Sequence, residues 1–204
     1  MGANVNHKLA SAWRLSAPVI EEISRQSEFI ESLTYYNKHS EEMKVGSGGQ
    51  MVKLRGPIVA PNFFDLLELR PMIGRTFVAG DGDPGAVKTI IISHGLWMRQ
   101  FGGDPKVIGQ SLELDELSYS VIGVMPSNVQ YPFDEAESAF WLPHSFTSED
   151  LNDDPRDDWV PMARLREGVS LTDLQSMLDV VAARRTESMK EGAKPFTIQA
   201  GSAR

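Results

Sequence analysis

The chain has 204 residues, of which 41% are hydrophobic and 24% charged, which is ordinary for a globular protein of one domain or two small ones. Its formal net charge of −8 argues against nucleic acid or anionic lipid headgroups as direct partners, because both require a basic surface. The absence of cysteine excludes disulfides, a thiolate nucleophile and a thiolate metal site. The sequence contains no run of about 18 apolar residues, which a membrane-spanning helix would need. Residues 1–12 also lack the apolar core of a signal peptide.

The first predicted elements are a helix, a strand and a hairpin. The helix begins after Ser16, a favourable capping residue, carries Pro18 in its first turn and runs to about Ser27. The segment Phe29–Tyr36 has strand character. Residues 43–54 alternate around a glycine-rich centre at residues 46–49, which predicts a β-hairpin with glycines in its turn.

The next segment combines a short helix with two irregular loops. The helix begins near Asn62, and the compact loop Leu69–Phe77 that follows contains Arg75. Arg75 could contact an anion or a partner, but we expect it to tie its loop to a nearby carbonyl or carboxylate. Asp81 and Asp83 lie among glycines and invite a calcium interpretation. Because the further oxygen ligands and the closing glutamate of an EF-hand loop are missing, we expect a solvated turn.

The central stretch, residues 88–126, has the clearest local signals. The β-branched run Thr89–Ile92 predicts a strand buried on both faces. Ser93 is expected to cap a short helix that ends at Gly102, and Asp104-Pro105 turns the chain. Alternating apolar residues on both sides of a polar quartet then predict a hairpin over residues 112–124.

The C-terminal part is predicted to begin with a short strand at Phe140–Leu142 and to end with a strand, a helix and a strand. Between them, the acidic run Ser148–Asp158 could bind a cation or a basic partner, but we expect an exposed, extended crossing loop. The closing unit consists of the strand Trp159–Leu165, a helix and the strand Lys194–Gln199, which a right-handed crossover would place in one sheet.

The helix of this closing unit has signals at both ends. Ser170 and Asp173 form a near capping box at its start, and Arg184-Arg185 suits its C-terminus. Leu174, Leu178 and other apolar residues recur at helical spacing along one face.

The usual signatures of an enzyme are missing. Ser93 and His94 are sequence neighbours at a helix start, where their side chains diverge, and Ser93 is not in a G-x-S-x-G elbow. The other histidines, His7, His39 and His144, show no zinc-binding spacing. A P-loop motif is absent as well. We therefore predict no catalytic, cofactor-binding or metal-binding residue.

Three blocks of sequence carry a family resemblance. They are VAPNFFDLLELRPMIGRTF (Val59–Phe77), IISHGLWMRQFGGDPKVIGQSLELDELSYSVIGVMP (Ile91–Pro126) and WVPMARLREGVSL (Trp159–Leu171). In this order and spacing the chain resembles the periplasmic core domain of MacB-like ABC-transporter permeases, and most closely the branch of orphan permeases with two such domains per chain.

The resemblance implies an α+β fold in two subdomains. A discontinuous porter-like subdomain with ferredoxin-like βαβ elements would comprise residues 1–57 and 156–204 and hold both termini. A mixed α/β subdomain bearing the VIGVMP hairpin would be inserted at residues 58–155. The implied location is the periplasmic side of the bacterial inner membrane, anchored by membrane helices outside this chain.

The resemblance also implies a non-catalytic role without cofactors. The domain would transmit motion between membrane helices and a periplasmic partner. The implied partners are a homologous second permease domain, a periplasmic adaptor or an exported substrate, and the membrane through the flanking helices. The alternatives are a stand-alone extracytoplasmic ligand-binding module and a hydrolase that uses Ser93 and His94.

Overall fold

The protein is described from a computed structural model, which covers residues 9–12, 14–37, 41–47, 50–129, 138–153, 159–188 and 199–202. The chain divides into two compact units. One consists of Met1–Tyr35 with Ser148–Arg204, and the other of Tyr36–Thr147. These boundaries differ from those expected at 57/58 and 155/156, and the expected division into subdomains stays a prediction.

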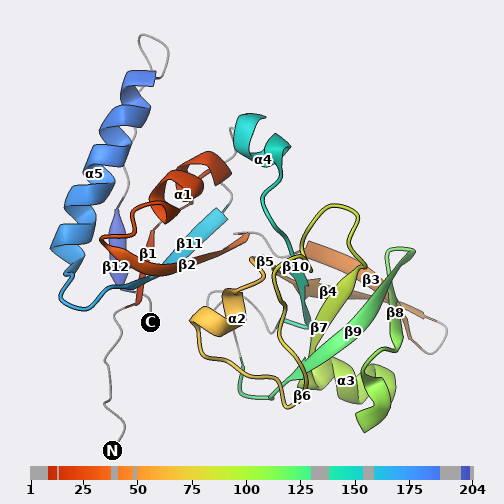
Figure 1. The fold of residues 1–204 in the computed structure, drawn as a ribbon. Helices are drawn as coiled ribbons and strands as arrows, with labels where there is room; N and C mark the ends of the chain where they lie inside the picture. Colours follow the sequence, from red (N-terminus) through yellow and green to blue (C-terminus); the bar gives the residue numbers. More distant parts are fainter. Residues whose placement is uncertain are drawn as a thin grey trace, which may run out of the picture. The chain divides into compact units, whose positions relative to one another are not determined.

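The first unit combines a sheet with helices (Figure 1). Its elements are β1 (Leu9–Ala12), α1 (Ala17–Ser24), β2 (Ile30–Asn37), α4 (Ser148–Asp153), β11 (Trp159–Leu165), α5 (Leu171–Ser188) and β12 (Ala200–Ser202). The strand order is β12-β1-β11-β2, and β1 is antiparallel to both β11 and β12. This order, with α1 and α5 as the connecting helices, is the ferredoxin-like βαββαβ arrangement.

The strands β11 and β12, which flank α5 in sequence, lie in one sheet with β1 between them. The strand expected at Lys194–Gln199 falls almost wholly outside the described residues, and the final described strand is Ala200–Ser202. Figure 1 shows α5 running beside α1. Each helix has buried apolar residues; they are Ala17, Val19, Ile20 and Ile23 of α1 and Leu174, Met177, Leu178, Val181 and Ala182 of α5.

The ends of the helices show which capping predictions hold. The amide of Ser170 donates to the Asp173 carboxylate at 2.8 Å, and the Asp173 amide donates to the Ser170 hydroxyl at 3.1 Å, which confirms the capping box. Ser16 does precede α1, but its hydroxyl makes no capping hydrogen bond. Pro18 has no N–H, and the Val19 amide donates to the Ser16 carbonyl instead.

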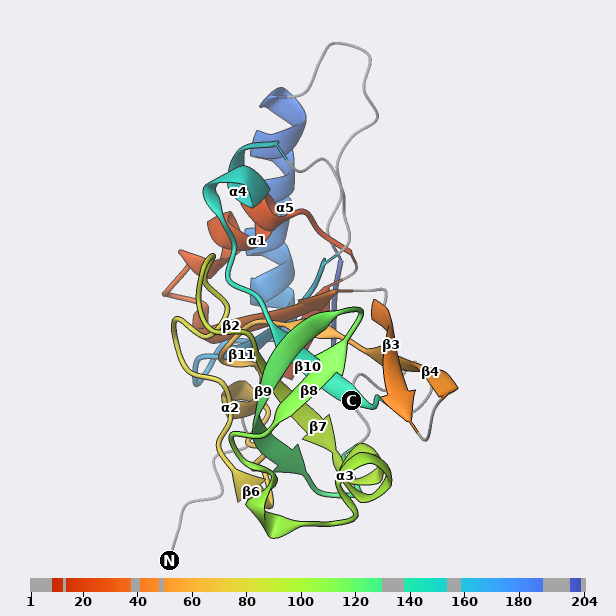
Figure 2. The same ribbon diagram turned by 90° about the vertical axis from the view of Figure 1, so that its right-hand side faces the viewer.

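The second unit contains most of the strands (Figure 2). Its elements are β3 (Glu41–Ser47), β4 (Gln50–Gly56), β5 (Ile58–Val59), α2 (Phe63–Leu66), β6 (Ile73–Gly74), β7 (Thr89–Ser93), α3 (His94–Phe101), a 3₁₀ turn η1 (Pro105–Val107), β8 (Ser111–Leu114), β9 (Leu117–Met125) and β10 (Phe140–Pro143). The sheet order is β5-β10-β7-β9-β6, with β8 on β9 and a separate β3–β4 hairpin. Asn62 precedes α2, although its side chain makes no capping hydrogen bond there.

Strand β7 lies at the centre of this sheet. It runs parallel to β9 and antiparallel to β10, and all five of its residues are buried. Helix α3, the 3₁₀ turn and the β3–β4 hairpin pack around it in one apolar cluster, to which Val45, Ile90, Ile92, Leu96, Trp97, Val107, Leu114, Val124 and Phe140 contribute. The prediction of a doubly buried strand is confirmed.

Most of the local predictions for this unit are confirmed. The Ser93 hydroxyl accepts a hydrogen bond from the Leu96 amide at 3.2 Å, and Gly102 ends α3 at φ 58°. The β8–β9 hairpin forms where expected, and its turn residues Asp115 and Glu116 have φ 45° and 67°. The β3–β4 hairpin forms as well, although Gly48 and Gly49 lie outside the described residues.

The prediction of an extended loop for the acidic run Ser148–Asp158 is wrong for its first part. Its first six residues, Ser148–Asp153, form helix α4 rather than an extended loop. Glu149 and Asp150 occupy the first turn, where negative side chains interact favourably with the partial positive charge of a helix N-terminus. Residues 154–158 lie outside the described part of the chain.

Candidate functional site

Ser93 and His94 do not form a nucleophile and base pair. The Ser93 hydroxyl caps α3, and the His94 ring packs edge-on against Trp97 with centroids 5.5 Å apart. His144 packs against Phe146 at 6.2 Å. His7 and His39 lie outside the described residues. Within the described ranges, no cluster of three or more histidine, aspartate or glutamate side chains has a geometry that could hold a metal ion.

Arg75 ties its loop to a neighbouring turn, as expected. Its guanidinium donates to the Thr76 carbonyl at 2.9 Å and to the Asp81 carboxylate at 2.6 Å. This hydrogen bond to Asp81 raises the pKa of Arg75. Burial raises the pKa of Asp81, but hydrogen bonds from Arg75 and the Val78 amide outweigh that effect and hold the pKa below its usual value.

The glycine-rich segment around Asp81 forms turns, with the Asp81 amide donating to the Val78 carbonyl and the Asp83 amide to the Gly80 carbonyl. The Asp81 side chain is only 12% exposed, however, so it is not the solvated group that the sequence suggested. The difference arises because Asp81 pairs with Arg75, which lies in a different loop. The carboxylate therefore has a structural partner in place of a metal ion.

A small cavity of about 240 Å³ lies beside this segment. It is bordered by residues 81–89, Tyr119 and His144. The Lys88 ammonium lies 5.9 Å from the centre of the Tyr119 ring. Burial, with a smaller contribution from the negative charges of Asp115 and Glu41, raises the pKa of Tyr119. Asp115 and Glu41 are not among the residues that line the cavity, and its volume is smaller than that of the second candidate, so the cavity is the weaker candidate.

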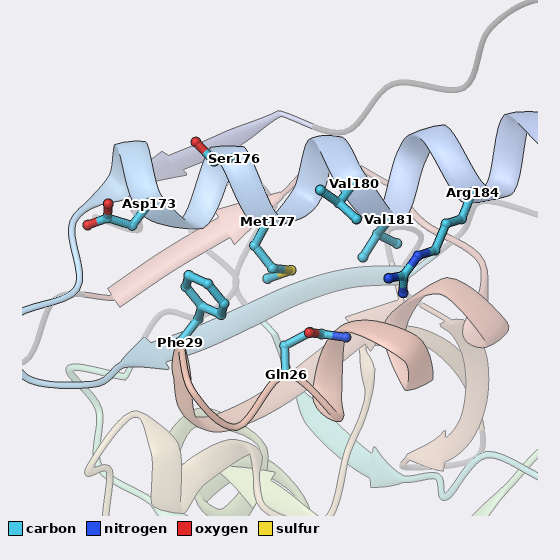
Figure 3. A pocket seen from close by; sticks show the side chains of 8 residues that line it. All are labelled: Gln26, Phe29, Asp173, Ser176, Met177, Val180, Val181 and Arg184. Carbon is cyan, nitrogen blue, oxygen red and sulfur yellow. The ribbon is translucent and has the colours of Figure 1, made fainter.

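The better-formed candidate is a groove in the first unit, between α5 and the turn that joins α1 to β2 (Figure 3). Its volume is about 380 Å³, and it is lined by Gln26, Phe29, Asp173, Ser176, Met177, Val180, Val181 and Arg184. Met177 and Val181 are buried, whereas Val180 is 50% exposed. The lining is mainly apolar with a few polar groups, as in many small-molecule sites.

Sequence reasoning did not identify this groove. The helical spacing on α5 predicted its apolar face, but the groove also requires Gln26 and Phe29, which are about 150 residues earlier in the chain. A signal was present in Val180, an apolar residue outside the predicted apolar face of this helix.

Comparison with known proteins gives a family match that spans most of the chain. Residues 3–181 match the family model described as the MacB-like periplasmic core domain. No curated protein matches the chain. No described helix has the length and apolar composition needed to cross a membrane.

Solved structures of low identity share the fold. A permease domain from Porphyromonas gingivalis is 20% identical, with a TM-score of 0.66, and the match covers 97% of this chain and 89% of that one. The periplasmic region of MacB from Actinobacillus actinomycetemcomitans is 15% identical, with a TM-score of 0.68 and coverage of 94% and 88%. The extracellular domain of the noncanonic ABC-type transporter YknZ from Gram-positive bacteria is 15% identical, with a TM-score of 0.62 and coverage of 95% and 99%.

Proposed function

This chain belongs to the family of MacB-like periplasmic core domains of ABC-transporter permeases, and we propose that it is the extracytoplasmic, non-catalytic part of such a permease. In this role it passes the motion of membrane helices to a periplasmic partner or substrate. The energy comes from an ATPase on the other side of the membrane. The partners proposed are a homologous second permease domain, with an adaptor or an exported substrate at the periplasmic face.

The observation that carries the proposal is the pairing of β1 with β12. Ala10 lies opposite Ser202 and Ala12 opposite Ala200, so the first and last described strands are antiparallel neighbours. A domain inserted between two membrane helices is expected to have its entry and exit close together, because both helices end at the same membrane surface. The pairing of β1 with β12 is consistent with such an insertion.

The packing of each unit also suits a transmitting role. Motion passes through an element only if that element is packed well enough to move as a body. In the second unit β7 is buried along its whole length, and in the first unit α1 and α5 each bury several apolar side chains. The Ser93 hydroxyl accepts the hydrogen bond that caps α3, which gives this residue a structural role.

The reading frame on either side of this segment tests the proposal. We expect an apolar stretch of about 20 residues shortly before Ser11 and another shortly after Arg204. Stop codons or long soluble extensions at these positions would contradict the proposed permease role. They would favour the second candidate, a stand-alone ligand-binding module, which the groove beside α5 supports.

A further inference from the structure

The groove beside α5 has an apolar floor. Figure 3 shows Met177 pointing from α5 toward the turn that carries Gln26 and Phe29, and Val181 lying farther along α5 toward Arg184. The exposed fractions of Met177 and Val181 are 7% and 1%, so packing fixes both and leaves little of their surface for a ligand, whereas Phe29 is only partly buried. Val180 adds a half-exposed apolar wall. A volume of about 380 Å³ is at the lower end of the range for sites that hold small molecules, roughly 300–1,000 Å³.

The two charged groups of the groove are not equivalent. Asp173, near the start of α5, accepts hydrogen bonds from both the amide and the hydroxyl of Ser170, so its carboxylate is engaged in the helix cap. Arg184 is near the other end of the helix. Its guanidinium approaches Glu22 at 3.8 Å, which is beyond hydrogen-bonding distance, and its side chain is 65% exposed.

The geometry points to a binding site for a small amphipathic anion. We propose that the apolar body of the ligand lies against Phe29 and Val180, and that its carboxylate or similar head binds the guanidinium of Arg184. A guanidinium can bind a carboxylate through two parallel N–H donors, which favours an anionic head at this end. This inference goes beyond the permease role, and it holds or fails independently of it.

A change at Glu22 should affect ligand binding in the opposite direction to a change at Arg184. Its carboxylate is near Arg184 and competes with an anionic ligand for the same guanidinium. Removing the charge at Glu22 should therefore strengthen binding, whereas removing the charge at Arg184 should weaken it. A site that only collects apolar molecules would respond to neither change.

The test is an NMR titration of the 204-residue chain with octanoate, using octanamide as the uncharged counterpart. Saturable shifts of the amides of residues 26–29 and 173–184 are expected with octanoate. Arg184→Gln should weaken octanoate binding by about three- to fivefold, because the 65% exposed guanidinium is screened by water, and should leave octanamide binding unchanged. Glu22→Gln should strengthen octanoate binding by about threefold.

Two further variants complete the design. Arg185→Gln makes the same change in charge at the next position, which does not line the groove, and should alter the affinity by less than about twofold. Val180→Asp puts a negative charge in the wall and should abolish saturable binding of octanoate. Shifts that do not saturate, equal losses in Arg184→Gln and Arg185→Gln, or groove shifts that depend on protein concentration without ligand would overturn the proposal. The last result would identify a second copy of the chain as the occupant.

Discussion

Lys44 and Asp115 exchange two hydrogen bonds: the Asp115 amide donates to the Lys44 carbonyl at 3.1 Å, and the Lys44 amide donates to the Asp115 carboxylate at 3.0 Å. The contact joins the β3–β4 hairpin to the turn between β8 and β9. Asp115 has φ 45°, so one residue provides both the turn and the link. Aspartate tolerates this left-handed conformation better than most residues.

The first prediction concerns this link. Asp115→Ala should destabilise the protein by about 1–2 kcal/mol, because it removes the carboxylate acceptor and places alanine at positive φ. Asp115→Asn keeps an acceptor and should have a smaller effect. Urea denaturation measures both, and hydrogen exchange at the Lys44 amide shows whether the link is lost. Unchanged exchange at Lys44 in Asp115→Ala would show that the hairpin is held by other contacts.

The second prediction concerns acid stability at Asp81. The folded state holds the pKa of Asp81 below its usual value of 3.8, so its contribution is present above pH 3.8 and is lost as the pH falls through the lower folded value. Asp81→Asn should lower the free energy of unfolding by about 1–2 kcal/mol at pH 6. The loss is no larger because Arg75 is half-exposed and water screens its attraction to Asp81. The difference in the free energy of unfolding between wild type and Asp81→Asn should be smaller at pH 3 than at pH 6. A gap that stays constant between these pH values in chemical denaturation would rule out the ion pair as its source.

The third prediction compares two serines at helix starts. Ser93→Ala should lower the free energy of unfolding by about 1 kcal/mol, because the hydroxyl caps α3. Ser16→Ala should have a smaller effect, because that hydroxyl makes no capping bond. Ester turnover should be absent from wild type and from Ser93→Ala alike. Turnover that disappears in Ser93→Ala would revive the hydrolase alternative.

The fourth prediction compares two glycines of the β3–β4 hairpin. A Cβ added at Gly56 would lie 2.2 Å from the Phe140 carbonyl oxygen, so Gly56→Ala should destabilise by about 3 kcal/mol. At Gly46 nothing lies within 4 Å of the added atom. Gly46→Ala should be neutral or stabilising by about 0.5 kcal/mol. Thermal unfolding measures the stability of each variant. Equal changes in stability for Gly56→Ala and Gly46→Ala would mean that the packing of Gly56 on β10 is not as described.

The fifth prediction concerns association. If membrane helices bring two such domains together, as proposed above for this chain, the isolated chain should be a monomer or a weak dimer. Gel filtration over a range of protein concentrations measures this. A tight oligomer whose size does not change on dilution would contradict it.

Local structure was predictable where short-range signals agree. In residues 88–126 the β-branched run, the Ser93 cap and the glycines at 102 and 103 all point to the same strand and helix, and the structure confirms both. The pairing of Ser170 with Asp173 was predictable for the same reason, since both partners lie within one helical turn.

The remaining features depend on contacts between distant residues. The link between Lys44 and Asp115 joins residues 71 positions apart. The groove joins residues 26–29 to residues 173–184. No short-range pattern encodes that proximity, so a single sequence could predict the apolar face of α5 but not what lies opposite it.

The location of the domain is tested most directly by labelling a single cysteine in the intact cell. The chain has no cysteine of its own, and Val87 is 75% exposed. In the full permease, with any cysteines elsewhere replaced, Val87→Cys should react with a membrane-impermeant maleimide before the inner membrane is broken, and the protein should stay with the membranes after alkaline extraction. Labelling only after lysis of the inner membrane would contradict a periplasmic permease domain.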